Sequence, residues 1–241
     1  FHPLVVHLPI GVLMLVGLAE VATFSPRYRP RIDPALGLVL PVLLVVTVTA
    51  FALDPLGMRV VYLADQEFDG RFELYTVPAD GSSAPVRLHA PLSGALDVKD
   101  FQISADAARV VFHGDLRSDE VFELFSAPLD ASRGPVRLNA NLASGGDVFD
   151  YRISPDGKRV LYRADQAVDD LMELFSTSIH GSRGQVKLSR PLVPGGHVDS
   201  FQISADSCTV AFTSQRLVIP PVEPPGGGNP QPLTLLTAPI R

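Results

Sequence analysis

Residues 59–108 read RVVYLADQEFDGRFELYTVPADGSSAPVRLHAPLSGALDVKDFQISADAA, and this stretch decides the fold because its pattern returns twice without a gap. The second copy begins at Arg109 with RVVFHGDL and the third at Arg159 with RVLYRADQ. A fourth begins at Thr209 with TVAFTSQRL, is interrupted by a Pro/Gly-rich insertion, and resumes as LTLLTAPIR. Self-similarity at a fixed period of fifty residues indicates a repeat architecture.

Each copy predicts four short strands. In the first copy they are RVVYLA (59–64), FELYTV (72–77), VRL (86–88) and DFQIS (100–104). They are rich in β-branched and aromatic residues, and Asp-Gly, Gly-Ser and Gly-Gly turn signals separate them. No helical period appears after residue 54. Four strands in each fifty-residue repeat are typical of a propeller blade, so the predicted fold class is mainly β.

The repeats resemble the TolB-like β-propeller repeat over residues 48–241. The resemblance is carried by ISPDGKR (153–159), which matches the turn between the innermost and second strands, and by Glu173-Leu174-Phe175, which opens the third strand. It implies the propeller fold strongly. For function it implies a range of roles, because such propellers serve as binding platforms, as periplasmic partners and as lids of peptidases.

The fourth blade is expected to lack its outer strand. Its third strand, 233–240, follows the insertion at 218–232, which we interpret as an extended loop or a contact arm for a partner. Closed propellers have four to eight blades. The chain is therefore expected to be part of a longer one, to complete the ring with its N-terminal part, or to associate with other subunits through an open edge.

The first 47 residues predict a membrane-inserted helical hairpin. The runs 4–24 and 35–53 are nearly free of charge and come close to the length that spans a bilayer, and the helices are expected over 4–24 and 35–47. The loop SPRYRPRIDP between them holds Arg27, Arg29 and Arg31. By the positive-inside rule this loop is cytoplasmic, which places residues 54–241 in the periplasm. The alternatives are a buried hairpin of a soluble domain, or an apolar strand pair over 36–53, since the repeat register reaches back to Val48 and Phe51.

The opening FHPLVVHLPIG resembles a family of predicted bacterial membrane proteins of unknown function whose first helix begins HPxxVHxPI. That resemblance predicts a location in the bacterial cell membrane. Histidine in a membrane segment is a candidate axial ligand for haem, so His2 and His7 are candidate haem ligands. Because they lie five residues apart on a helix, they would need partners from another helix or chain. The alternative is that both are structural.

Composition limits the partners. The net charge is −6 and the first 53 residues contribute +1, so the rest of the chain carries −7. A nucleic-acid partner is excluded, because phosphate recognition needs clustered Lys and Arg. Protein partners in a membrane complex and membrane lipid are expected instead. The single Cys208 forms neither a disulfide within the chain nor a thiolate metal site.

Carboxylates recur in the hairpin between the second and third strands of each repeat. They are candidate calcium ligands, because hard cations bind several oxygens. The spacing lacks the alternation of an EF-hand loop, and the alternative is that these residues favour tight turns. The recurrent aspartates are Asp65, Asp69, Asp115, Asp119, Asp165 and Asp169, and Glu73, Glu123 and Glu173 accompany them.

The sequence lacks the short motifs that mark common catalytic and nucleotide-binding sites. It has no GxSxG, HExxH or GxxxxGK[ST]. Four histidines occupy different repeat positions, as expected of incidental surface residues: His89, His113, His180 and His197. We therefore expect a non-enzymatic, membrane-anchored, periplasmic binding or scaffolding subunit. The alternatives are the substrate-gating propeller of a larger hydrolase or peptidase, and a haem-bearing redox subunit.

Overall fold

The computed structural model describes residues 48–182, 184–189, 191–217 and 234–240. The chain separates into two compact units, Phe1–Thr47 and Val48–Arg241. The predicted membrane hairpin, the haem candidates His2 and His7 and the insertion at 218–232 lie outside the described residues. Within the described part, the structure contains no helix with the length and apolar character that crossing a membrane requires.

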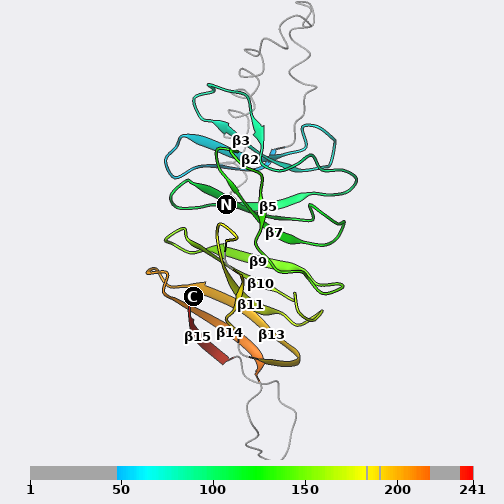
Figure 1. Ribbon diagram of the computed structural model, residues 1–241, viewed down its shortest axis with the longest axis vertical. Coiled ribbons are helices and arrows are strands. Elements are labelled where there is room, and N and C mark those ends of the chain that lie inside the picture. The colour runs from blue at the N-terminus through cyan, green and yellow to red at the C-terminus, as the bar shows by residue number, and fades with distance from the viewer. Residues whose placement is uncertain (1–47, 183, 190, 218–233, 241) are drawn as a thin grey trace, which may run out of the picture. The chain divides into compact units, whose positions relative to one another are not determined.

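The described residues form four antiparallel sheets, which we call blades 1 to 4 (Figure 1). Blade 1 consists of β1 (Val48–Leu53), β2 (Arg59–Ala64), β3 (Glu73–Pro78) and β4 (Val86–Arg87). Blade 2 consists of β5 (Val98–Ile103), β6 (Arg109–Gly114), β7 (Glu123–Pro128) and β8 (Val136–Arg137). Blade 3 consists of β9 (Val148–Ile153), β10 (Arg159–Ala164), β11 (Glu173–Ser178) and β12 (Val186–Lys187). Blade 4 consists of β13 (Leu192–Ile203), β14 (Thr209–Leu217) and β15 (Thr234–Pro239).

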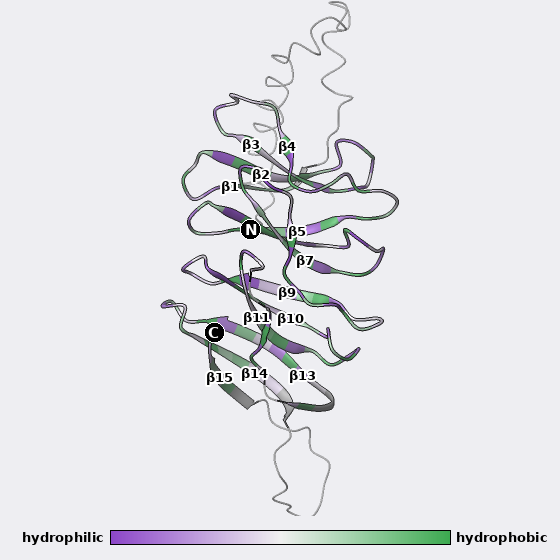
Figure 2. Cartoon of the chain, viewed as in Figure 1, coloured by the Kyte–Doolittle hydropathy of each residue, from purple (hydrophilic) through white to green (hydrophobic). Residues whose placement is uncertain are grey.

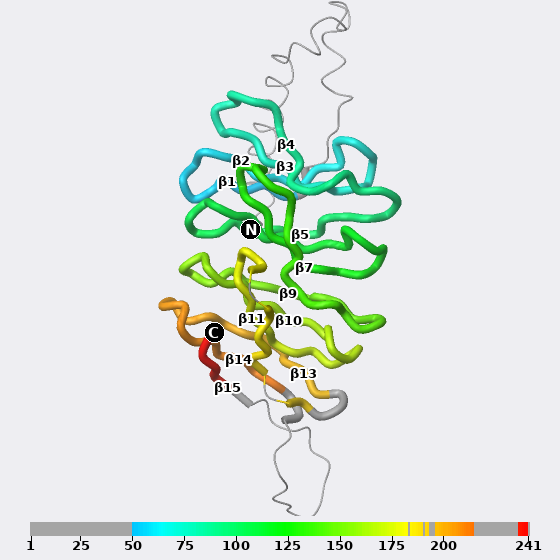
Figure 3. Tube along the Cα trace, viewed as in Figure 1, coloured from blue at the N-terminus to red at the C-terminus, as the bar shows by residue number. Residues whose placement is uncertain are grey.

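The predicted mainly β fold with four-stranded repeats is confirmed. Strands follow each other within a blade in chain order, and the blades follow each other along the chain, as the colours of Figure 3 show. Figure 2 shows both apolar and polar residues along the strands of each blade. The second and third strands hold most of the buried positions, as in RVVFHG of β6 and ELFSAP of β7.

A serine and an aspartate fix the turn from the first to the second strand. In blade 2 the Ser104 hydroxyl donates to Asp106 Oδ1 at 2.6 Å and accepts the Arg109 N–H at 3.0 Å. Blade 1 uses a single aspartate instead, because Asp54 Oδ1 accepts the N–H groups of Leu56 and Met58. Side chains that bond nearby backbone in this way favour turns over continued strand.

The cores lie between blades. One cluster joins β2 and β3 to β6 and β7, a second joins blades 2 and 3, and a third joins blades 3 and 4. Stacked aromatic pairs sit at the same register in the first three blades: Tyr62–Tyr75, Phe112–Phe125 and Tyr162–Phe175, with ring centroids 5.4–5.7 Å apart. Each sheet therefore buries its faces against its neighbours, as propeller blades do.

Side chains also tie one blade to the backbone of the next. The Gln102 amide donates to the Tyr151 carbonyl at 3.0 Å and accepts the Ile153 N–H at 3.3 Å. In the reverse direction, the Tyr151 hydroxyl donates to the Val111 carbonyl at 3.2 Å. These bonds fix the register of neighbouring blades, on which any site between blades depends.

Candidate functional site

The recurrent aspartates lie in the loops between the second and third strands, as predicted. Asp115 and Asp165 are buried and hold backbone. Asp115 accepts the N–H groups of Asp97 at 2.7 Å and Glu120 at 3.3 Å. Asp165 likewise accepts those of Asp147 and Asp170. Asp65 accepts the Gly70 N–H at 3.3 Å, while Asp69, Asp119 and Asp169 are exposed.

A second carboxylate in each connection extends this network across blades. Asp97 Oδ1 accepts the Phe72 N–H and Asp147 Oδ1 accepts the Phe122 N–H, both at 2.7 Å. The pKa of Asp147 is raised, chiefly because burial disfavours its charged form, and the nearby Asp165 and Asp169 add to the effect. Asp97 and Asp147 therefore bond the starts of β5 and β9 to the preceding blade.

The geometry gives the calcium hypothesis no support of its own. Within the described residues, no group of three or more His, Cys, Asp or Glu is placed to hold a metal ion. The buried aspartates instead bond backbone N–H groups, which agrees with the turn interpretation. Calcium binding at these loops stays a prediction.

The recurrent glutamates are buried and paired with the outer strand. Glu73 bonds Arg87 at 3.0 Å, Glu123 bonds Arg137 at 2.7 Å, and Glu173 bonds Lys187 at 2.8 Å. Glu73 also accepts the Tyr75 hydroxyl and the Leu92 N–H. Burial acts to raise the pKa of Glu73, but these bonds outweigh it and the pKa is lowered. The pairs attach the outer strand to each blade.

Two histidines expected at the surface are buried. His89 is 7% exposed and His113 is 8% exposed. His113 lies 2.7 Å from the Val148 carbonyl of the next blade and 3.4 Å from Asp100. The expectation was wrong because the ring nitrogens of both imidazoles have partners within the protein, backbone groups for His89 and the Val148 carbonyl and Asp100 carboxylate for His113, which lets them enter the core.

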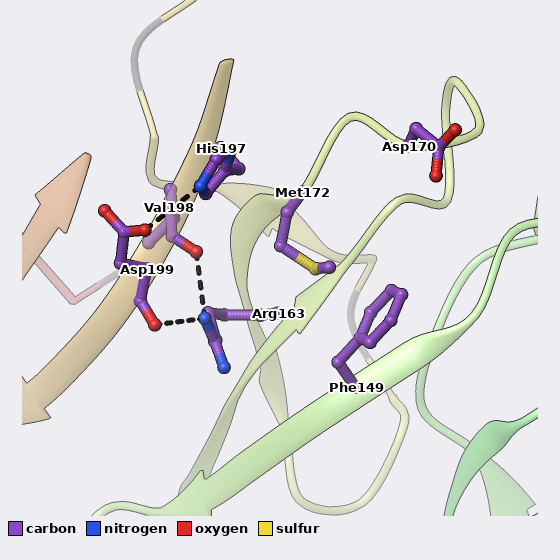
Figure 4. Close-up of a pocket in the computed structure, with 7 residues that line it drawn as sticks. All are labelled: Phe149, Arg163, Asp170, Met172, His197, Val198 and Asp199. Carbon is purple, nitrogen blue, oxygen red and sulfur yellow. Dashed lines mark hydrogen bonds and ion pairs between the residues drawn. The ribbon is translucent and has the colours of Figure 1, made fainter. Parts of the chain in front are cut away.

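An open hollow of about 320 Å³ lies between blades 3 and 4, at the end of the blades that carries the aspartate loops (Figure 4). Its lining comes from β9, β10, β13 and the loop before β11: Phe149, Arg163, Asp170, Met172, His197, Val198 and Asp199. The Phe149 side chain is 49% exposed, which is unusual for a large aromatic residue. The hollow therefore combines apolar surface with charged groups.

Arg163 is held rigidly at the base of this hollow. Its guanidinium bonds both carboxylate oxygens of Asp150, at 2.7 and 2.9 Å. It also donates to the carbonyls of Val198 and Asp199, as Figure 4 shows. Beside it, His197 Nε2 lies 3.1 Å from Asp199 Oδ1. Such a bidentate and backbone-anchored arginine has little freedom to move. The hollow is thus formed before any ligand arrives.

Sequence reasoning missed this hollow, although aligned positions carry a signal. The repeat places Lys99 and Asp199 where blade 3 has Phe149, and it places Asp97 and Asp147 where blade 4 has His197. A change in the chemical type of the residue at an aligned position indicates where one blade differs from the others.

A second hollow of about 360 Å³ lies along the inner strands at the other end of the blades. It is lined by Gln102, Arg152, Ile153, Pro155, Gln202 and Ile203. Gln102, Arg152 and Gln202 occupy the same repeat position in blades 2, 3 and 4. A row of polar side chains therefore crosses these three blades. Gln102 is engaged with backbone, as described above.

Comparison with known proteins finds similarity to solved structures alone. No family model and no curated protein matches the sequence. A putative TolB from Agrobacterium tumefaciens is 18% identical over 73% of this chain and 57% of that chain, with a TM-score of 0.48. A structure of prolyl endopeptidases is 14% identical over 71% of this chain and 26% of that chain, with a TM-score of 0.51.

The β-propeller domain of the Trilobed protease from Pyrococcus furiosus is 11% identical over 73% of this chain and 51% of that chain, with a TM-score of 0.44. The chain thus spans only part of the length of each of these proteins. At such identities the likeness concerns the fold alone. It assigns no activity.

Proposed function

We propose that this chain is a non-enzymatic binding or scaffolding subunit, anchored in the membrane, whose blades present a surface to a protein partner in the periplasm. The observation that carries the proposal is the preformed hollow between blades 3 and 4. There a half-exposed Phe149 ring lies in a site that also holds the carboxylates of Asp170 and Asp199. Exposed aromatic residues in a preformed hollow are typical of contacts that contribute strongly to binding.

The chemistry of the hollow indicates the kind of partner. Residues 54–241 carry a net charge of −7, and the aspartate loops concentrate carboxylates at the end where the hollow lies. A negative surface attracts basic segments and raises their rate of association. We therefore infer that the partner presents a segment with both basic and apolar side chains.

Membrane anchoring rests on the two apolar runs of the sequence, 4–24 and 35–47. The test is flotation of the full chain with lipid vesicles before and after a carbonate wash. We expect the chain to stay with the vesicles after the wash, because a membrane-spanning helix such as the one predicted over 4–24 inserts effectively irreversibly. Release by carbonate would contradict the anchoring.

The binding role is tested with fluorescein-labelled nonapeptides that carry a central Lys-Phe-Lys, compared with peptides that carry Glu-Phe-Glu. We expect the basic peptide to bind, and Phe149→Ser to weaken it at least tenfold, as loss of a central aromatic contact does. Val136→Ser is the matched control, because Val136 is also exposed, at 38%, but lies on the outer strand of blade 2. Equal binding of the two peptides, or an unchanged affinity in Phe149→Ser, would contradict the proposal.

A second candidate is the propeller part of a larger peptidase. It is supported by the likeness to the prolyl endopeptidase structure, of which this chain spans 26%. The reading frame beyond Arg241 separates the two candidates. A following domain with a GxSxG motif, and cleavage of proline-containing peptides by the full protein, would favour the peptidase.

A further inference from the structure

Blade 1 exposes more apolar surface than its neighbours. Six of the ten large apolar side chains that are exposed in the described residues belong to it, although it is one of four blades. Four of the six lie within eight residues on β1 and the turn after it. We call these four the blade 1 patch: Phe51 (45% exposed), Leu53 (57%), Leu56 (66%) and Met58 (66%).

The same positions are covered in the later blades. Phe51 aligns with Tyr151, which is 5% exposed, and with Phe201, which is 4% exposed. Leu53 aligns with isoleucines that pack against the cores between blades. In those blades the preceding blade provides the cover, and among the described residues no blade precedes β1.

The turn of blade 1 is apolar where the other turns are polar. Leu56 takes the place of an aspartate that occurs in all three other blades, and Met58 takes the place of Ala108, Lys158 or Cys208. The absence of a preceding blade does not account for this exchange, because the corresponding turn residues of blades 2 and 4, Asp106 and Asp206, lie at the surface. The two apolar side chains are therefore a separate sign that this turn faces an apolar environment.

The turn holds its shape without a partner. The Asp54 side chain is 5% exposed, and its Oδ1 accepts the N–H groups of Leu56 at 3.0 Å and Met58 at 2.9 Å. The Asp54 N–H in turn donates to the Arg59 carbonyl at 2.9 Å. The one carboxylate in this stretch thus bonds backbone, and the turn presents its apolar side chains outward.

We propose that the blade 1 patch rests on the lipid surface of the membrane that anchors the chain, an inference that builds on the proposed anchoring. Between Pro34 and Met58 the sequence holds a single charged residue, the buried Asp54. The second predicted helix ends at residue 47, and four residues reach at most about 14 Å, so anchoring through that helix would keep Phe51 within this distance of the helix end. Uncharged apolar side chains next to a span favour the headgroup and acyl boundary over water.

The test exploits the absence of tryptophan from the whole chain. Leu56→Trp then supplies the single tryptophan signal of the full chain. The protein is reconstituted in phosphatidylcholine–phosphatidylglycerol vesicles whose acyl chains are either brominated or not. We expect brominated chains to lower the fluorescence of Leu56→Trp at least twofold, because quenching requires contact with the acyl region.

Met58→Trp is the second reporter in case Leu56→Trp folds poorly, and Val186→Trp is the matched control. Val186 is exposed, at 37%, on the outer strand of blade 3, so bromine should leave its fluorescence unchanged. Quenching of either patch reporter and not of the control supports the proposal.

Three outcomes overturn the inference in distinguishable ways. If the chain floats with the vesicles and neither patch reporter is quenched, the inference is wrong while the anchoring stands. A blue shift that grows with protein concentration and is not quenched shows that a second copy covers the patch. Failure of the chain to float with vesicles removes the anchoring and the inference together.

Discussion

The imidazole of His89 accepts a hydrogen bond from the backbone N–H of Leu74, with His89 Nε2 3.0 Å from the nitrogen. The other ring nitrogen, Nδ1, lies 2.8 Å from the Ala90 carbonyl and donates to it, which fixes a neutral tautomer. Asn139 makes the same two contacts one repeat later, to the Leu124 N–H and the Ala140 carbonyl. Histidine and asparagine therefore perform one structural task at one repeat position.

The neutral form of His89 predicts that one part of the pH dependence of the free energy of unfolding comes from this residue. Burial lowers the pKa of His89 below its ordinary 6.5, because protonation would place a charge in the core and remove the acceptor for Leu74. Below pH 6.5 the unfolded chain binds a proton at this histidine that the folded chain does not, so the free energy of unfolding falls as the pH falls.

His89→Asn should abolish that part of the loss while preserving stability at pH 7.5, since asparagine keeps both hydrogen bonds. Urea unfolding at pH 7.5 and 5.5 measures the effect in both proteins. His89→Leu is the control that removes the acceptor, and it should cost about 1–3 kcal/mol at pH 7.5. An equal loss of stability in the wild type and His89→Asn between these pH values would contradict the assignment.

A second prediction compares the contributions to stability of two carboxylates, one buried and one exposed, that bond the same arginine. Glu73 and Glu67 both bond Arg87 Nη1, at 3.0 and 2.9 Å, but their side chains are 1% and 47% exposed. Glu73→Ala should lower the free energy of unfolding by about 3–5 kcal/mol, because it breaks a buried pair. Glu67→Ala should cost at most about 1 kcal/mol, as exposed pairs do.

The effect of Glu73 also has a direction with pH. Because the pKa of Glu73 is lowered in the folded protein, its contribution is present above the ordinary value of 4.5 and is lost as the pH falls through the folded pKa. Urea unfolding between pH 7 and 3 measures it. Similar costs for Glu73→Ala and Glu67→Ala would show that burial does not decide the strength of these pairs.

The repeat carried most of the fold prediction. Positions shared by the first three copies, such as Arg59, Arg109 and Arg159 at the start of the second strand, define strands whose pairing is local, and local antiparallel pairing follows from sequence spacing. The carboxylate loops were located for the same reason. Their task was open between cation binding and turn formation, because spacing does not reveal which backbone N–H groups lie within reach.

The hollow between blades 3 and 4 could not be predicted in this way. It depends on Phe149 and Met172, which differ from the residues at the same positions of other repeats, and on their packing across a blade boundary. Arg163 illustrates the limit. Its counterparts are Leu63 and His113, so nothing in the repeat indicates that it bonds Asp150 and the backbone of the next blade.

A third prediction concerns the connection that leads into blade 3. Gly145 has a φ of +86°, in the left-handed region, and its neighbour across space is the Asp169 carboxylate, 2.9 Å from where a Cβ would lie. Gly145→Ala should cost about 1–2 kcal/mol, chiefly from the backbone conformation, since the carboxylate end of Asp169 can move. Thermal unfolding measures the change.

Gly134→Ala is the matched control for that substitution. A Cβ at Gly134 would meet nothing within 4 Å, and its φ lies outside the left-handed region. Alanine there should be neutral or should stabilise by up to about 1 kcal/mol, because it restricts the unfolded chain. If both alanine variants melt at the wild-type temperature, the connection at Gly145 is not constrained by its φ.

The last prediction concerns the edge of blade 4. In blades 1 to 3 the third strand pairs with a short outer strand, as in Thr76 with Val86 and Ser126 with Val136. Thr237 of β15 occupies the same register position, and within the described residues no strand lies beyond β15. Open edges recruit further strands, and each backbone group left buried and unpaired costs about 1–3 kcal/mol.

We therefore propose that a partner chain or another segment of the full protein covers β15. In the detergent-solubilised full chain, amide hydrogens of β15 should exchange about as slowly as those of β11, whose outer side is paired with β12. The particle should also exceed the 25.9 kDa of one copy if a partner supplies the strand. Fast exchange in β15 from a particle of 25.9 kDa would show that water alone satisfies this edge, because an uncovered strand exchanges its outward N–H groups at nearly the rate of the unfolded chain.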